Sequence, residues 1–290
     1  MPDPEQEPCD DTLPTLQDDP PANILPLGQS PSYSSEYSLN TAPPERAFPS
    51  WSPWDVVAVL AFAGVAWIVL SGIALGIARF AMGKQHVPVK ELAENPLVAL
   101  GAQTAAELAI VIFMVAWIGR RSLLGFWKAI YWNWRARRVP GLLLGGVVLA
   151  LIVDFASRYL PMPKSLPVEK FFTDAPTAYL MSALGVILAP LLEELFFRGL
   201  FYPLVRRTIG VTPAVLLTAT LFAFIHGAQL GYAWAPLLSI FVVGVVLTLV
   251  RQLTESVSAS YLVHCGYNLA LFGMLWIGSD HFRHLEKVTN

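Results

Sequence analysis

The sequence predicts an all-α membrane protein, a polytopic bundle of about seven transmembrane helices, with a range of six to eight. Of its 290 residues, 55% are apolar and 14% are charged, and the mean hydropathy is +0.54. These values are too apolar for an ordinary soluble domain of this length. Several windows also hold about 20 mostly apolar residues, which is the length that crosses the ~30 Å hydrocarbon layer. The alternating ten-residue pattern of a membrane β-barrel is missing from the sequence.

The first 54 residues differ from the rest of the chain. They contain 12 of the 23 prolines and nine of the 21 acidic residues, but only one basic residue, Arg46. A segment of this composition cannot bury enough apolar surface to offset its chain entropy. We therefore predict that 1–54 is a disordered, acidic, Pro-rich tail. A cleavable signal peptide is not expected, because no short basic segment followed by an apolar run opens the chain.

Seven apolar windows after this tail are predicted to cross the membrane as helices, because backbone groups in lipid must satisfy their own hydrogen bonds. The windows are 56–78, 96–118, 140–157, 177–197, 211–227, 234–250 and 257–277. The Trp-rich segment Leu123–Trp134 lies between the second and third windows. We predict that it forms a helix at the membrane interface rather than a span.

The orientation of the bundle is predicted from the basic residues of its short loops. The loop after the second window carries six of them: Arg120, Arg121, Lys128, Arg135, Arg137 and Arg138. This loop is expected on the cytoplasmic side. The N-terminus is then cytoplasmic too, and seven spans place the C-terminus on the opposite side.

Two adjacent carboxylates interrupt the fourth window. An ionisable side chain inside a span costs roughly 2.5–3.5 kcal/mol or more, so it needs a partner, a water-filled cavity or a function. Glu194 and Arg198 have the i, i+4 spacing of a helical ion pair, with the acid first. Glu193 lies about 100° away around the helix and is free to face another group. Taken alone, the pair also fits a salt bridge at the end of a helix near the membrane surface.

Two later windows carry further polar side chains. His226 lies near the end of the fifth window, four residues after Phe222, and His264 and Asn268 lie one turn apart in the last window. Each of these side chains alone could be structural, because polar groups hold transmembrane helices together by hydrogen bonds. Their occurrence on three windows of the second half favours a chemical site.

The three motifs together resemble those of one family. Glu193-Glu194-x-x-x-Arg198, Phe222-x-x-x-His226 and His264-x-x-x-Asn268 are similar, in this order, to the motifs of the CAAX protease and bacteriocin-processing family, also called CPBP or Abi. The family includes type II CAAX prenyl endopeptidases, which remove the last three residues of prenylated proteins. The resemblance implies a catalytic core over 175–280, with transmembrane helices and the basic loop over 55–174 and a short tail over 281–290.

The activity implied by the resemblance is hydrolysis of a peptide bond within the membrane. In a glutamate-based scheme, Glu193 and His226 activate a water, and His264 and Asn268 bind the oxyanion. Glu194, Arg198 and Phe222 support the site. In a rival scheme, Glu193, His226 and His264 hold Zn²⁺. The same residues serve both schemes, and the sequence has no HExxH motif that would fix a zinc site.

The resemblance implies a peptide or lipid-modified protein tail as substrate, with the lipid bilayer as surroundings and the bacterial inner membrane as location. No phosphate-binding loop or nucleic-acid motif indicates a soluble cofactor or a nucleic-acid partner. Two alternatives remain open. One is a non-catalytic membrane scaffold with the same fold. The other is a transporter, although the inverted repeat expected of many transporters is not evident.

Two polar pairs of the first half are left out of the predicted catalytic set. Gln103 and Glu107 lie one turn apart in the second window, where a hydrogen bond to a neighbouring span is favoured over a place in a cavity. Asp154 and Arg158 have the spacing of a plain ion pair near the end of the third window.

Overall fold

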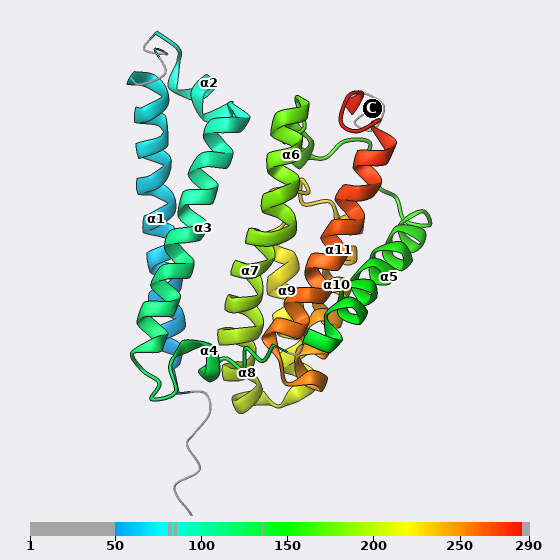
Figure 1. The fold of residues 1–290 in the computed structure, drawn as a ribbon. Coiled ribbons are helices and arrows are strands. Elements are labelled where there is room, and N and C mark those ends of the chain that lie inside the picture. The colour runs from blue at the N-terminus through cyan, green and yellow to red at the C-terminus, as the bar shows by residue number, and fades with distance from the viewer. Residues whose placement is uncertain (1–49, 81–82, 84–85, 135, 286–290) are drawn as a thin grey trace, which may run out of the picture. The chain divides into compact units, whose positions relative to one another are not determined.

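The fold was described from a computed structural model, which defines residues 50–80, 83, 86–134 and 136–285. Within these ranges the secondary structure is helical and contains no strand, which confirms the predicted all-α class. The predicted tail over 1–54 lies almost entirely outside the described residues. The long single helices are α1 (Pro53–Phe80), α3 (Pro96–Gly119), α5 (Val139–Ser157), α9 (Val211–Ile225), α10 (Trp234–Thr254) and α11 (Val257–Gly278) (Figure 1).

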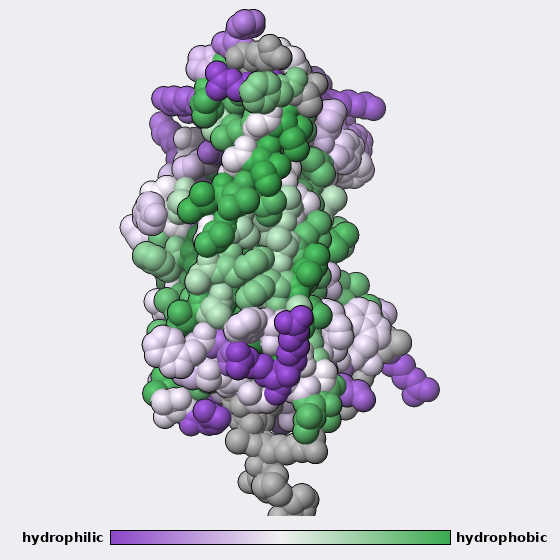
Figure 2. Space-filling view, turned by 90° about the vertical axis from the view of Figure 1, so that its left-hand side faces the viewer, coloured by the Kyte–Doolittle hydropathy of each residue, from purple (hydrophilic) through white to green (hydrophobic). Residues whose placement is uncertain are grey.

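Six of the seven predicted windows lie wholly within helix, and the fifth, 211–227, extends two residues beyond the end of α9 at Ile225. By length and composition, five helical stretches of the described chain can cross a membrane: α1, α3, α5, Ala175–Ile209 and α10. α9 has only 15 residues and is a shorter apolar helix, and α11 is not among the five. The polar residues of α11, including His264 and Asn268, lower its hydropathy. Figure 2 shows a broad hydrophobic band between two more polar ends.

The Ala175–Ile209 stretch is longer than the predicted 177–197 window and contains two π-helical segments. It consists of α6 (Ala175–Ala183), the π-helical η3 (Leu184–Leu188), α7 (Ala189–Glu194), the π-helical η4 (Leu195–Phe201) and α8 (Tyr202–Ile209). The two glutamates of α7 therefore lie inside a continuous helical stretch. The sequence had instead indicated a position near the end of a helix. π-Helical turns are frequent at functional sites.

α5 and α11 pack with their backbones in direct contact. A Cβ atom added at Gly146 of α5 would collide with the carbonyl oxygen of Val263, and one added at Gly266 of α11 would collide with that of Leu143. Small residues allow such close approach between helices in membranes. The contact fixes the part of α11 that carries His264.

The loop between α3 and α5 corrects one prediction. Instead of an interfacial helix over Leu123–Trp134, that segment contains a single helical turn, α4 (Phe126–Ala129). Left-handed backbone at Gly125 (φ 74°) and Tyr131 (φ 62°) ends the helical winding on both sides. Phe126 and Ile130 are buried in a core cluster, so the segment packs against the bundle. Three short helices complete the fold: α2 (Val89–Glu94), η1 (Ala136–Arg138) and η2 (Pro167–Phe171).

Candidate active site

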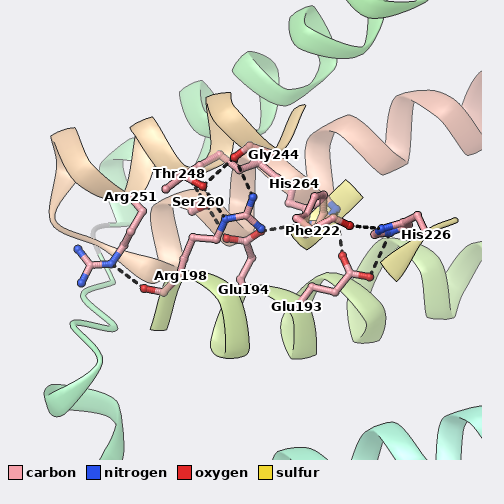
Figure 3. Close-up of polar contacts among 11 residues, drawn as sticks. Glu193, Glu194, Arg198, Phe222, His226, Gly244, Thr248, Arg251, Ser260 and His264 are labelled. Carbon is pink, nitrogen blue, oxygen red and sulfur yellow. Dashed lines mark hydrogen bonds and ion pairs between the residues drawn. The ribbon is translucent and has the colours of Figure 1, made fainter. Parts of the chain in front are cut away.

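Glu193 lies between two imidazoles that come from different helices. Its Oε1 is 3.7 Å from Nε2 of His226, at the C-terminal end of α9, and its Oε2 is 3.7 Å from Nε2 of His264 on α11 (Figure 3). These distances are too long for direct hydrogen bonds. The side chains of Glu193, His226 and His264 are 18%, 16% and 5% exposed. The structure thus brings together three of the four predicted catalytic side chains.

Glu194 faces away from Glu193 and forms a fully buried ion pair with Arg198. Nη1 of Arg198 lies 2.9 Å from Oε1 of Glu194, and both side chains are 0% exposed. The predicted i, i+4 pair is confirmed, but it lies in the protein interior and not at the membrane surface. Breaking such a pair leaves an uncompensated buried charge, which typically costs about 3–5 kcal/mol.

The pair is completed by hydrogen bonds from α10 and α11. Arg198 donates from Nη2 to the carbonyl oxygen of Gly244 (3.0 Å) and from Nε to Oγ1 of Thr248 (3.3 Å). The hydroxyl of Ser260 donates to Oε2 of Glu194 (2.5 Å). These partners were not predicted. Ser260 could have been found, because it lies four residues before His264 on the same face of its helix.

Both histidines are oriented through their Nδ1 atoms. Nδ1 of His226 lies 2.7 Å from the carbonyl oxygen of Phe222, and a carbonyl can only accept, so this nitrogen carries a hydrogen. Nδ1 of His264 lies 3.0 Å from Oε1 of Glu194. The Nε2 atoms of both rings therefore point to Glu193. Fixing one imidazole nitrogen in this way sets the role of the other.

Phe222 and Asn268 occupy the edges of this group. The Phe222 ring packs against His226 (4.9 Å between centroids) and His264 (5.8 Å), and the guanidinium carbon of Arg198 lies 4.4 Å from its centroid. Asn268 donates from its side-chain amide to the carbonyl oxygen of Gly185 in η3 (2.7 Å). One amide hydrogen of Asn268 is thus used within the fold, and the second is left for another acceptor.

A cavity of about 330 Å³ connects these groups. Its lining includes Glu193, His226, His264, Asn268 and Phe222 at one side and apolar residues such as Phe172, Phe272 and Leu275 toward one end of the bundle. Cavities of this size hold small ligands or short side-chain segments. The arrangement can therefore hold a substrate group next to a carboxylate and two imidazoles.

Two polar pairs of the first half can now be placed. Gln103 donates to Glu107 (2.8 Å) within α3, and both side chains line the same cavity. The predicted hydrogen bond from this pair to a neighbouring span is therefore wrong. The less favoured alternative, in which the pair lines a cavity, is correct. Arg158 and Asp154 form the predicted exposed ion pair at 2.9 Å.

The arrangement does not suit a metal ion as it stands. Carboxylate and imidazole are suitable zinc donors, and both Nε2 atoms point inward. Among the described residues, however, no group of three His, Cys, Asp or Glu side chains is placed so that it could hold a metal ion. The reaction proposed below therefore has no step that passes through a metal.

The family resemblance extends beyond these motifs. Residues 175–270 match the family described as type II CAAX prenyl endopeptidase Rce1-like. This Rce1-like segment contains all three motifs and begins with α6. The predicted resemblance to CAAX prenyl endopeptidases is thereby confirmed for this part of the chain, and the matched family is one of proteases. No curated protein and no solved structure matches the chain.

Proposed function

We propose that this protein is an intramembrane endopeptidase that cleaves a peptide bond in a membrane-associated peptide or protein tail. The observation that carries the proposal is the convergence of His226 and His264 on Glu193 inside a cavity between helices. The match of the Rce1-like segment supports the same reaction class.

In the proposed reaction, Glu193 removes a proton from a water that lies between its carboxylate and the two imidazoles. The water oxygen forms a bond to the carbonyl carbon of the substrate, and the carbonyl oxygen becomes an oxyanion. The C–N bond then breaks, and Glu193 returns the proton to the leaving amine. One water is consumed and two peptide products are released.

The two histidines have different supporting roles: His226 positions the water, and His264 binds the oxyanion. The Nδ1–H of neutral His226 is bound to the Phe222 carbonyl, so its Nε2 can accept a hydrogen bond from the attacking water. His264 binds the oxyanion through Nε2–H when both of its nitrogens are protonated. Its Nδ1–H then donates to the carboxylate of Glu194.

Asn268 is proposed as the second oxyanion donor. Its bond to the Gly185 carbonyl holds the amide at the cavity wall, and the second amide hydrogen serves the oxyanion. Preorganised donors of this kind typically contribute about 10²–10³ in rate. Glu194 and Arg198 act as positioning residues, because they contact His264 and the helix backbone rather than the reacting atoms.

We further propose that the basic loop faces the cytoplasm of a bacterial cell. The start of α1 and the α3–α5 loop lie at the same end of the bundle, and α11 ends at the opposite end (Figure 1). A cytoplasmic loop thus places the beginning of α1 on the cytoplasmic side. Labelling of single cysteines at Arg137 and Arg283 with a membrane-impermeant reagent tests this, because only Arg283→Cys should react in intact cells.

The function is tested by cleavage of fluorogenic peptides, with and without a prenyl group, by the purified full chain in detergent. Glu193→Gln should abolish cleavage, whereas Glu107→Gln, which changes another carboxylate of the same cavity, should retain it. Equal cleavage by wild type and Glu193→Gln would contradict the mechanism. A cellular function that Glu193→Gln fully retains would favour the non-catalytic scaffold.

A further inference from the structure

A second pocket lies at the end of the bundle where α8 and α10 terminate. It has a volume of about 350 Å³ and is lined by Arg206 and Arg207 of α8, Arg251 of α10, Tyr131 and Glu255. Three arginines thus face one glutamate. No acidic side chain of the described chain forms an ion pair with any of these arginines. The pocket has a surplus of positive charge and is separate from the cavity around Glu193.

Arg251 is the most unusual member of this pocket, because its residue is only 4% exposed. Its Nε donates to the carbonyl oxygen of Arg198 (3.3 Å), and its guanidinium carbon lies 5.4 Å from the Tyr131 ring centroid. Its two terminal nitrogens make no hydrogen bond to a described residue and point away from the carboxylates of the candidate active site (Figure 3). Arg251 forms no ion pair with a described acidic side chain, and the single glutamate of the pocket balances only one of its three arginines, so the pocket favours binding of an anion.

We propose that Arg206, Arg207 and Arg251 form a binding site for a phosphate group, presented either by an anionic lipid headgroup or by a free phosphate compound. Guanidinium groups match phosphate oxygens with paired, charge-assisted hydrogen bonds. The phosphate groups of lipids lie at the membrane–water interface, and the pocket would lie at that level of the bilayer. α8 directly follows the apolar part of a membrane-crossing stretch, and the basic α3–α5 loop lies at the same end.

The phosphate site touches the candidate active site at one point. Arg251 holds the backbone carbonyl of Arg198, and the side chain of Arg198 holds Glu194, which in turn binds His264. An anion on Arg251 would fix this guanidinium against the π-helical segment η4. The occupied site would therefore stabilise the helix that carries both glutamates.

The test measures thermal unfolding of the purified full chain in a neutral detergent at constant ionic strength. Three probes are added separately: sodium phosphate, dihexanoyl phosphatidylglycerol and the zwitterionic dihexanoyl phosphatidylcholine. Binding to the folded state raises Tm with ligand concentration in a saturable way. We expect saturable stabilisation by phosphatidylglycerol, and none by phosphatidylcholine.

The variants separate this site from general charge attraction. Arg206→Gln/Arg207→Gln should weaken the apparent affinity at least tenfold, since both guanidinium groups lose their charge-assisted hydrogen bonds to the phosphate oxygens. Arg120→Gln/Arg137→Gln removes the same charge at the same end, outside the pocket, and should leave the affinity within about twofold. All four arginines are exposed, and the single variants Arg206→Gln and Arg207→Gln serve if the double variant unfolds.

The outcomes distinguish the sources of the phosphate. Stabilisation by both sodium phosphate and phosphatidylglycerol that depends on Arg206 and Arg207 identifies a site for free phosphate groups. Stabilisation by phosphatidylglycerol alone identifies a lipid headgroup site. The proposal is overturned if neither probe gives a saturable shift, or if both double variants lose the shift equally. Because no outcome depends on peptide cleavage, failure of the proposed protease function would leave this result intact.

Discussion

Nδ1 of His264 lies 3.0 Å from Oε1 of Glu194. The carboxylate that forms the buried ion pair with Arg198 therefore also orients a candidate catalytic imidazole. The two adjacent glutamates therefore have separate tasks, although they differ by one position in the chain. Glu194 belongs to the interior of the bundle and Glu193 to the cavity. Substitution of each should have a different effect.

Glu194→Gln is expected to destabilise the protein. The change leaves the guanidinium of Arg198 buried without its counter-charge, at a cost of about 3 kcal/mol or more. Thermal unfolding in detergent should show a clearly lower Tm. Glu193→Gln is the matched control, since it makes no ion pair with an arginine, and its Tm should stay close to that of wild type. Similar Tm values for both variants would argue against a structural role of the Glu194–Arg198 pair.

Glu193→Gln is expected to reduce kcat at least ~10³-fold while KM changes little. The amide keeps the shape of the side chain but cannot take the proton of water, which is needed only in the reaction step. Steady-state kinetics on a cleaved peptide provide the measurement. A rise in KM with unchanged kcat would instead assign Glu193 to substrate binding.

Treatment with a chelator is expected to leave activity unchanged, because the proposed reaction uses a carboxylate and two imidazoles without a metal step. The measurement compares cleavage before and after dialysis against a zinc chelator. Loss of activity that Zn²⁺ restores would support the rival scheme, in which Glu193, His226 and His264 hold the ion.

Gly146→Ala is expected to lower Tm substantially, since the added methyl group meets the backbone carbonyl of Val263. Overpacking of this kind typically costs about 1–3 kcal/mol. Gly145→Ala is the control on the adjacent position, where an added Cβ has no neighbour within 4 Å. Gly145→Ala should be neutral or slightly stabilising through better helix propensity. Equal effects of the two variants would argue against close α5–α11 packing.

The pH dependence of stability can be predicted for Asp174, which caps the start of α6 outside the membrane-spanning stretch. The hydrogen bond from the backbone N–H of Thr177 (2.9 Å) lowers the pKa of this carboxyl below its ordinary value. Its stabilising effect is therefore present above about pH 4 and is lost as the pH falls through the lowered pKa.

Asp174→Ala should reduce stability by about 1 kcal/mol at neutral pH, as typical for loss of a helix cap. The Tm difference from wild type should shrink as the pH falls below about 4. Asp174→Asn is the control, because an amide oxygen still caps the helix but does not titrate. A Tm difference for Asp174→Ala that is constant from pH 7 to pH 3 would contradict the role of the carboxylate.

The sequence predicted the features that depend on local spacing. The i, i+4 relation of Glu194 and Arg198 implied their pairing, and the 100° offset implied that Glu193 faces elsewhere; both relations are present in the structure. The helices also follow from composition, because long apolar runs in lipid have few other backbone solutions. These arguments need no knowledge of how the helices pack.

Features that depend on packing between helices were not predictable. Gly244 and Thr248 bind Arg198 only because α10 lies beside the Ala175–Ile209 stretch, and their residue types are ordinary in apolar helices. The hydrogen bond between Gln103 and Glu107 was within reach of local spacing, because the two residues lie i, i+4 apart in α3, whereas the cavity that both side chains line depends on packing between helices. The single turn α4 also replaced a predicted interfacial helix, since a Trp-rich pattern does not reveal left-handed backbone at Tyr131.

In the proposed reaction, the position of Glu193 along its helix determines how far a substrate must extend into the cavity. The cavity reaches Phe172, just before α6, and Glu193 lies 18 residues after Ala175, which corresponds to roughly 27 Å at ~1.5 Å per residue. An extended chain covers ~3.3 Å per residue, so about eight residues are needed to reach the carboxylate from that end. A folded domain closer than this to the scissile bond would stop at the membrane surface before that bond reached Glu193. The depth of the carboxylate would then admit only substrates in which a long, unstructured segment precedes or follows the scissile bond.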